Sequence, residues 1–241
     1  SEKAGQLSVI SILQALDLCL IGFSDAMVTA PISKEAINKA KYFYDGHTGL
    51  LASLTKNKKI CMMLVSQKMR VGLVTTHIPI KNISKQITKK IIIEKLEIIN
   101  NSLIYDFGIK KPCIAVLGLN PHSGDGGILG NEEKKIIIPA ISYANKIGIQ
   151  AKGPFASDAF FARFNPKDFD AILAMYHDQG LIPFKMTDNN RGINYTAGLK
   201  VIRTSPDHGT GFDIANKFIA NHKSTVEAIK LAIYLIKKRK K

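Results

Sequence analysis

The chain has 241 residues, 46% of them hydrophobic, which is enough to bury a core in one large domain or two smaller ones. Its formal net charge of +15 comes from lysines spread over the whole chain, and only the tail 236–241 is a compact basic run, which argues against a nucleic-acid-binding protein. We expect no membrane-spanning stretch and no signal peptide. The three cysteines lie far apart, outside any Cys-x-x-Cys pair, which favours free thiols and a cytoplasmic location.

Apolar runs alternate along the chain with segments of helical periodicity. The five runs that resemble strands are residues 25–34, 69–77, 113–122, 169–177 and 198–209. Between them we expect helices over 84–103 and 131–148, the second with Asn131 as its N-cap, and a last helix that opens with a capping box at Ser224–Glu227. Because strands buried on both faces read as continuous apolar runs, this alternation predicts an α/β fold with parallel strands.

Four of the apolar runs lead into a histidine, namely His77, His122, His177 and His208. Ligands of α/β sheets bind beyond the carboxyl ends of the strands, so these side chains are predicted to converge on one site. Three neutral imidazoles are a competent ligand set for a divalent ion. For any single histidine a purely structural role is the alternative, and the neighbouring Asp178 and Asp207 either orient the rings or cap turns.

Two further polar segments follow predicted strands. The glycine-rich stretch Asn120–Glu133 leads from a strand into a helix, and it is either a flexible turn or a phosphate-binding loop. Lys185, Asn194 and Arg203 suit a substrate that carries a phosphate or a carboxylate. Plain solvation is the alternative for each basic side chain in so basic a chain, and only their position after strand ends favours a site.

Seven segments together resemble a known family. They read GHTGLLA, TTHIPI, GLNPHSGDGG, GPFASDAFF, AMYHDQGLIPFK, RGINYTAGL and IRTSPDHGTGFDIA. In this order and spacing they closely resemble the motifs of 4-hydroxythreonine-4-phosphate dehydrogenase, the PdxA family of vitamin B6 biosynthesis. The resemblance covers nearly the whole chain.

This resemblance implies an isocitrate/isopropylmalate-dehydrogenase-like α/β fold with two domains around a cleft. Residues 1–38 and 195–241 would form parts of a discontinuous first domain, and residues 39–194 the second. The implied reaction is the oxidation and decarboxylation of 4-phosphooxy-L-threonine to 3-amino-2-oxopropyl phosphate, with NAD or NADP and one divalent ion, either Zn, Mg or Co. The family works as a homodimer whose active sites are completed by the partner subunit.

Residue by residue, the resemblance implies three metal ligands, His77, His122 and His177. The implied substrate contacts are His47, Thr48, Lys185, Asn194 and Arg203. Asp158 matches a family acid near the reacting centre, and Lys185 is our candidate for a proton carrier. The residues that bind the nicotinamide cofactor are left unassigned.

The sequence departs from the family pattern at several points. Gly49 stands where the family motif GHTE has an acid, and Ala159 replaces the hydroxyl residue of the motif ADT. The strand–helix units with which family members begin are expected to be missing. Two alternatives therefore stay open: the same chemistry on another phosphorylated four-carbon hydroxy acid, such as threonate or erythronate phosphate, or an inactive remnant that binds metal or phosphate.

Overall fold

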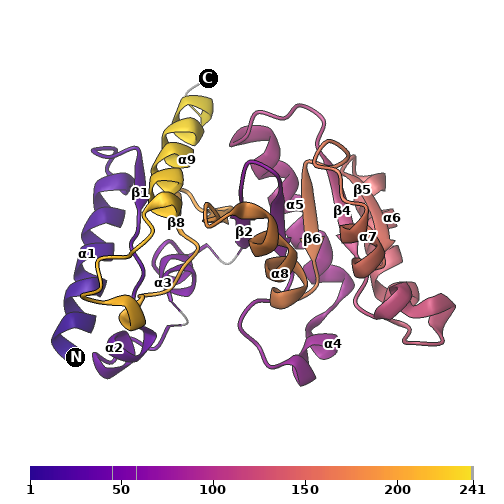
Figure 1. Ribbon diagram of the computed structural model, residues 1–241. Helices are drawn as coiled ribbons and strands as arrows, with labels where there is room; N and C mark the ends of the chain where they lie inside the picture. The colour runs from indigo at the N-terminus through magenta and orange to yellow at the C-terminus, as the bar shows by residue number, and fades with distance from the viewer. Residues whose placement is uncertain (45, 58, 240–241) are drawn as a thin grey trace.

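A computed structural model describes residues 1–44, 46–57 and 59–239 (Figure 1). The described residues form one eight-stranded sheet in the order β1-β8-β7-β2-β3-β6-β4-β5. In chain order the strands are β1 (Ala26–Val28), β2 (Cys61–Val65), β3 (Arg70–Leu73), β4 (Cys113–Leu117), β5 (Gln150–Phe155), β6 (Ala171–Ala174), β7 (Ile193–Ala197) and β8 (Ile202–Pro206).

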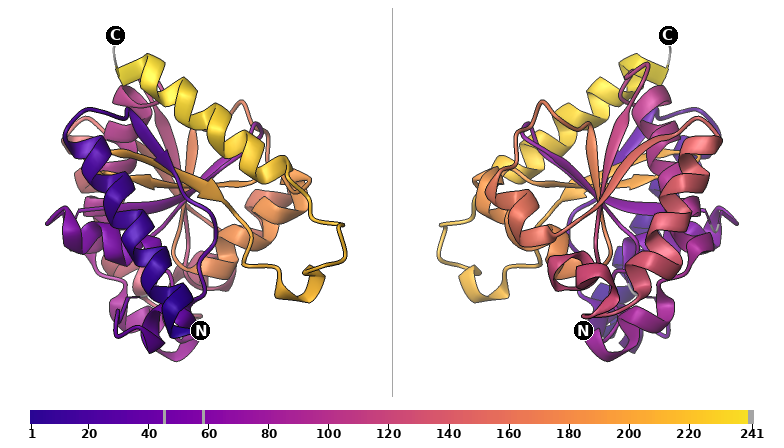
Figure 2. Two further views of the ribbon diagram at one scale, coloured as in Figure 1. Left: turned by 90° about the vertical axis from the view of Figure 1, so that its left-hand side faces the viewer. Right: turned by 90° about the vertical axis from the view of Figure 1, so that its right-hand side faces the viewer.

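Helices cover both faces of this sheet (Figure 2). The α-helices are α1 (Glu2–Leu20), α2 (Lys34–Lys39), α3 (His47–Leu54), α4 (Ile83–Gln86), α5 (Lys89–Tyr105), α6 (Ile138–Lys146), α7 (Ser157–Ala162), α8 (His177–Asp188) and α9 (Lys223–Arg239). Short 3₁₀ segments span Ile80–Asn82, Pro121–Gly127 and Phe212–Ile214, and a π-helical turn spans Glu133–Ile137.

Each of the five predicted apolar runs contains a strand, so the predicted α/β class is confirmed. The sheet is mixed rather than parallel, however, because β2 and β7 run antiparallel to their neighbours. The chain reverses between β2 and β3 within a tight turn, in which the Ser66 N–H donates to the Met69 carbonyl at 2.9 Å. A connection this short joins only antiparallel strands, since parallel neighbours require a long crossover.

Alternate residues of the central strands enter two different apolar clusters. Ile114 and Val116 of β4 belong to the cluster beneath α5, α6 and α9, whereas Ala115 and Leu117 belong to the cluster beneath α8. Successive side chains of a strand point to opposite faces, so the sheet is buried on both sides. A third cluster joins α1, α2 and α3 to residues 199–201. The predicted domain boundaries stay predictions.

One predicted helix start is confirmed and one is wrong. In the segment 131–148 the helical turns begin at Glu132, directly after Asn131, whose carbonyl accepts the Lys135 N–H at 2.8 Å, and Gly148 follows the end with φ +89°. Ser224 lies inside α9, where its hydroxyl donates to the Gly192 carbonyl and accepts from the Asp207 N–H at 3.0 Å. Tertiary partners therefore replace the capping role that the local pattern suggested.

The expectation that no stretch reaches membrane-spanning length is wrong for α1. This helix of 19 residues contains an 18-residue window with a mean hydropathy of 1.2 and meets that criterion by length and composition. This is weak evidence of a membrane segment, because core helices of soluble proteins meet it too. Val9, Ile12 and Leu16 on one side of α1 are buried against Met27 and Ile37 in the third apolar cluster.

Candidate active site

A cavity of about 450 Å³ lies where α3, β7 and β8 meet the segment after β3. Its lining includes five of the predicted site residues, His47, Thr48, His77, Asn194 and Arg203. His47 and Thr48 open α3, Asn194 belongs to β7, and Arg203 belongs to β8. The structure thus brings together side chains that are up to 156 positions apart in the sequence, from His47 to Arg203.

Arg203 is a buried cation, with only 2% of its surface exposed. Its guanidinium donates to the Thr29 hydroxyl at 2.8 and 3.1 Å and to the Thr196 hydroxyl at 3.4 Å. Among the described residues, none of the ion pairs involves Arg203. Burial lowers its pKa to about 10, still well above neutral pH, so the cavity wall carries an uncompensated positive charge that favours an anionic ligand.

Two polar atoms of the same cavity are buried without a hydrogen-bond partner, Nε2 of His47 and Oδ1 of Asn194. Burial, and secondly the charge of Arg203, lowers the pKa of His47 to about 3, so its ring is neutral at physiological pH. Buried polar groups of native proteins are nearly always paired, so unpaired ones that line a cavity mark the place of a polar ligand. An anionic substrate group in this cavity would contact the Arg203 cation and the His47 ring, which can donate a hydrogen bond.

His77 and His177 lie side by side, with their ring centroids 5.7 Å apart. His77 follows β3, and His177 begins α8 directly beyond β6, which pairs with β3 in parallel. Nδ1 of His177 is 2.6 Å from Oδ1 of Asp178, which leaves Nε2 as the ring atom available to a metal. The structure therefore brings two of the three predicted ligands together.

His122, the third predicted ligand, is exposed on the 3₁₀ segment beyond β4. Within the described ranges, no group of three or more His, Cys, Asp or Glu residues is placed to hold a metal. His122, Ser123 and Asp125 all have positive φ, between +41° and +54°, a conformation that is costly for residues other than glycine. Such strain persists only where the surroundings hold it in place.

Glu133 is the side chain that holds this strained turn. It is only 3% exposed, and its Oε1 accepts the N–H groups of Leu119 and Asn120, each at 2.7 Å. Its Oε2 accepts the Asn120 side-chain amide at 2.9 Å. It also fixes the glycines of the turn, since a Cβ on Gly124 would meet Oε2 at 2.6 Å. The sequence interpretation missed this residue.

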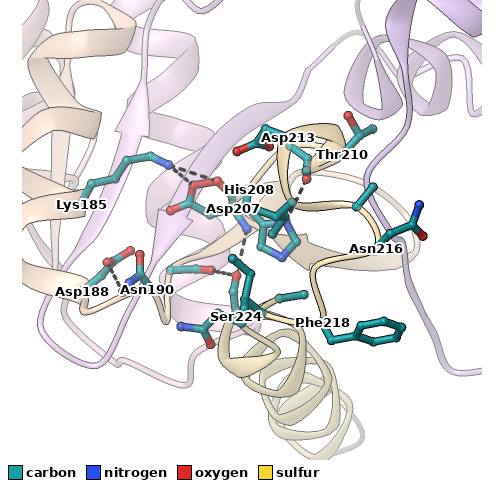
Figure 3. A pocket seen from close by; sticks show the side chains of 18 residues that line it. Lys185, Asp188, Asn190, Asp207, His208, Thr210, Asp213, Asn216, Phe218 and Ser224 are labelled. Atoms are coloured by element: carbon teal, nitrogen blue, oxygen red, sulfur yellow. Dashed lines mark hydrogen bonds and ion pairs between the residues drawn. The ribbon is translucent and has the colours of Figure 1, made fainter.

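Lys185 lies at a second and larger cavity, of about 860 Å³ (Figure 3). Its Nζ is 2.8 Å from Oδ1 of Asp207, toward which it points in Figure 3. The cavity lies under the loop between β8 and α9, which projects from the body of the molecule (Figure 2). His208 and Gly209 line both cavities, so the two are contiguous at the end of β8.

Asp158 is exposed in the first turn of α7. The residue before it, Ser157, accepts a hydrogen bond at 2.7 Å from the side chain of Gln179, which lies in the first turn of α8. The predicted acid is therefore tied to the helix that begins with His177. The sequence interpretation also missed Gln179, although it stands within the segment Tyr176–Gly180 that had been singled out.

Comparisons with known proteins give one consistent result. Residues 1–232 match the family model described as pyridoxal phosphate biosynthetic protein PdxA. Over 240 residues the chain is 48% identical to 4-hydroxythreonine-4-phosphate dehydrogenase of Sulfurihydrogenibium sp. (strain YO3AOP1), covering 100% of this chain and 74% of that relative. The crystal structure of the enzyme of that name from Klebsiella pneumoniae superposes with a TM-score of 0.88 at 38% identity, over 98% of this chain and 72% of that one.

A more distant structural match confirms the predicted fold class. Isocitrate dehydrogenase from Methylococcus capsulatus superposes with a TM-score of 0.51 at 10% identity, over 99% of this chain and 82% of that one. At this level of identity the match shows a shared fold and nothing about the substrate.

Proposed function

Because the chain belongs to the PdxA family, we propose that it oxidises 4-phosphooxy-L-threonine with a nicotinamide cofactor in pyridoxine biosynthesis, the reaction after which its relatives are named. The hydroxyl-bearing carbon 3 of the substrate gives a hydride to the cofactor, and the hydroxyl gives up a proton, which leaves a 3-keto acid. This acid then loses CO₂. The electrons of the broken bond pass to the ketone, and protonation gives 3-amino-2-oxopropyl phosphate.

The observation that carries the proposal is the buried cation Arg203 in the wall of the 450 Å³ cavity, together with Nε2 of His47, a buried atom of the same cavity without a hydrogen-bond partner. We assign the substrate phosphate to Arg203 and His47, with the Thr48 hydroxyl beside them. Oδ1 of Asn194 can only accept a hydrogen bond, so we assign it to an N–H or O–H group of the substrate. Donors that are fixed before binding lose little freedom when the anion arrives, and this favours tight and oriented binding.

We propose Lys185 as the residue that takes up the hydroxyl proton. Its Nζ lies at the larger cavity, where it contacts Asp207, whose side chain is only 8% exposed. Asp158, the acid tied to the His177 helix through Ser157, is proposed to lie near the reacting carbon when the substrate is bound. For both Lys185 and Asp158, the distance to the reacting atoms is set when the substrate binds.

The residues proposed to hold a divalent ion, whether Zn, Mg or Co, are His77, His122 and His177. Such an ion would supply Lewis-acid stabilisation of the negative charge that develops on the substrate oxygen. Asp178 orients the ring of His177 for this task. Since His122 stands apart on an exposed turn, we propose that a second copy of the chain supplies it, so that the active site is complete only in a homodimer.

We place the nicotinamide dinucleotide in the 860 Å³ cavity, where its size and its junction with the substrate cavity allow the hydride transfer. The charged side chains of this cavity are Lys185 and the acids Asp188, Asp207 and Asp213. Carboxylates suit the free ribose hydroxyls of NAD and repel the 2′-phosphate of NADP. We therefore propose NAD as the cofactor, and a cytoplasmic location, in keeping with the three free cysteines.

The test is NADH formation from 4-phosphooxy-L-threonine by the full chain, before and after chelation of divalent ions. We expect turnover that a chelator abolishes, and a kcat/KM at least about tenfold higher with NAD than with NADP. Arg203→Lys should raise the substrate KM about tenfold or more through loss of the planar, multidentate guanidinium. The matched control Arg163→Lys changes an exposed arginine and should leave KM unchanged.

Other outcomes would contradict the proposal in different ways. Turnover of threonate or erythronate phosphate, but not of 4-phosphooxy-L-threonine, would replace the substrate and keep the chemistry. An equal rise of the substrate and cofactor KM values in Arg203→Lys would refute the phosphate assignment. Metal binding without turnover of any of these substrates would identify an inactive relative.

A further inference from the structure

Gln179 is a buried polar residue to which the proposed reaction assigns no role. It is 8% exposed and lies in the first turn of α8, two positions after His177. Its Oε1 accepts the N–H of Met175 at 2.6 Å, and its Nε2 donates to the Gly118 carbonyl at 2.6 Å and to the Ser157 hydroxyl at 2.7 Å. One carboxamide thus connects three segments of the chain.

Each of these segments carries a residue of the proposed active site. Gly118 directly follows β4 and begins the loop that leads to His122, and Ser157 immediately precedes Asp158. Met175 joins β6 to α8, whose first residue is His177. The separations from Gln179 are 61 positions to Gly118 and 22 to Ser157, so the connections are tertiary.

The orientation of the Gln179 amide follows from its partners. The backbone N–H of Met175 can only donate and the carbonyl of Gly118 can only accept, so the oxygen must face the first and the nitrogen the second. A side chain of the same shape without the N–H groups cannot replace it, because its oxygen would face the Gly118 carbonyl oxygen. Buried contacts of this kind are costly, which makes the arrangement specific.

We propose that Gln179 is a positioning residue, which sets the spacing of the segments that present His122, Asp158 and His177. This inference rests on the proposed function. It holds whether His122 serves the site of its own chain or that of a second copy, since the spacing is fixed within each chain. Among the described residues, Gln179 forms no hydrogen bond with the residues of the anion site, which is built from α3, β7 and β8.

The separation between the two sites gives the inference its test. Gln179→Glu is nearly isosteric and removes both N–H donors. The matched control is Gln86→Glu, which makes the same change at an exposed glutamine of α4. For both variants of the full chain we would measure kcat and substrate KM by NADH formation, Co²⁺ affinity by its visible absorption, and the unfolding midpoint by circular dichroism.

If Gln179 positions the site, Gln179→Glu lowers kcat about 100-fold, the loss expected for misplacement by about 1 Å, and leaves the substrate KM within about threefold. Its Co²⁺ affinity falls about tenfold or more, as for second-sphere residues of metal sites. Gln86→Glu behaves like the unmodified chain. A kcat within about twofold of the unmodified chain, or a parallel loss of kcat and rise of KM, would overturn the inference.

Two further measurements keep the outcome clear. If Gln179→Glu does not fold, Ser157→Ala decides, because it removes one acceptor of Nε2 and leaves the other: a lower kcat with an unchanged KM supports the inference, and unchanged kinetics overturns it. If the unmodified chain turns over none of the substrates, the proposed function has failed. The Co²⁺ affinity then tests the inference alone, which is overturned if Gln179→Glu binds Co²⁺ as the unmodified chain does.

Discussion

The Asp178 carboxylate accepts a hydrogen bond from Nδ1 of His177 at 2.6 Å. These two residues begin α8, and two residues separate them from the end of β6. This contact selects the ring tautomer that keeps the Nε2 lone pair for a ligand. Because the Asp178 side chain is two-thirds exposed, we expect this carboxylate to orient the His177 ring and to contribute little to the stability of the fold.

Asp178→Asn therefore tests the metal site. An amide can also donate to Nδ1 and so favours the wrong tautomer, and we expect divalent-ion affinity to fall about 10–100-fold with little change in stability. Calorimetric titration of the apoprotein with Zn²⁺ measures the affinity. Asp17→Asn, at an exposed position of α1, is the control and should have no effect. Unchanged Zn²⁺ affinity in Asp178→Asn would remove His177 from the ligand set.

The sequence allowed the main strands to be predicted, because continuous apolar runs identify strands buried on both faces. The predicted convergence of four histidines at strand ends was met only in part: His77 and His177 lie side by side, whereas His122 stands apart on an exposed turn. Asn194 and Arg203 lie inside β7 and β8, not after strand ends, so their place in one cavity follows from the tertiary structure.

Three strands, β2, β5 and β7, were not predicted, each for a local reason. β7 reads INYTA, in which Asn194 and Thr196 interrupt the apolar run. β2 reads CMMLV, with little β-branching, and β5 contains Gly153 and Pro154, which usually indicate a loop.

Glu133 and Gln179 were not predictable in the same way. Glu133 reads as a first-turn acid of a helix, and Gln179 as part of a polar loop, yet each is buried. Their function depends on partners that only the tertiary structure supplies, such as Leu119 for Glu133 and Gly118 for Gln179. Lys185 shows the converse: its local segment was recognised, but the structure places it at a second cavity rather than in the lining of the first.

The pKa of His47 predicts how stability changes with pH. The folded value of about 3 lies below the ordinary 6.5, so between these values the unfolded chain binds a proton that the folded chain does not. Stability is therefore retained above pH 6.5 and falls as pH decreases from 6.5 toward 3, by up to about 1.4 kcal/mol per pH unit. Urea unfolding at pH 7 and at pH 5 measures this difference.

His47→Gln should make that pH dependence shallower, because the variant loses the titrating group while keeping a polar side chain. His222→Gln, which alters an exposed histidine before α9, is the control and should retain the full dependence. Equal pH dependence in both variants would show that the His47 ring is protonated in the folded chain.

The role of Glu133 predicts a large loss of stability on truncation. Glu133→Ala leaves the N–H groups of Leu119 and Asn120 without their acceptor, and each buried, unpaired donor costs about 1–3 kcal/mol. Glu35→Ala, which removes only an exposed ion pair with Lys39, should cost far less. Denaturant unfolding of both variants measures the difference. A loss in Glu133→Ala no larger than in Glu35→Ala would show that the turn around His122 does not depend on this carboxylate.

The proposed sharing of the site between subunits is tested by complementation. His122→Ala and His77→Ala should each be inactive alone, because each homodimer lacks one ligand at both sites. After the two variants are unfolded together and refolded, about half the dimers are mixed, and each mixed dimer has one intact site and one that lacks two ligands. Activity should therefore return to about a quarter of that of the unmodified protein. If His122 served its own chain, every site would lack one ligand and no activity would return, so the same mixture separates the two arrangements.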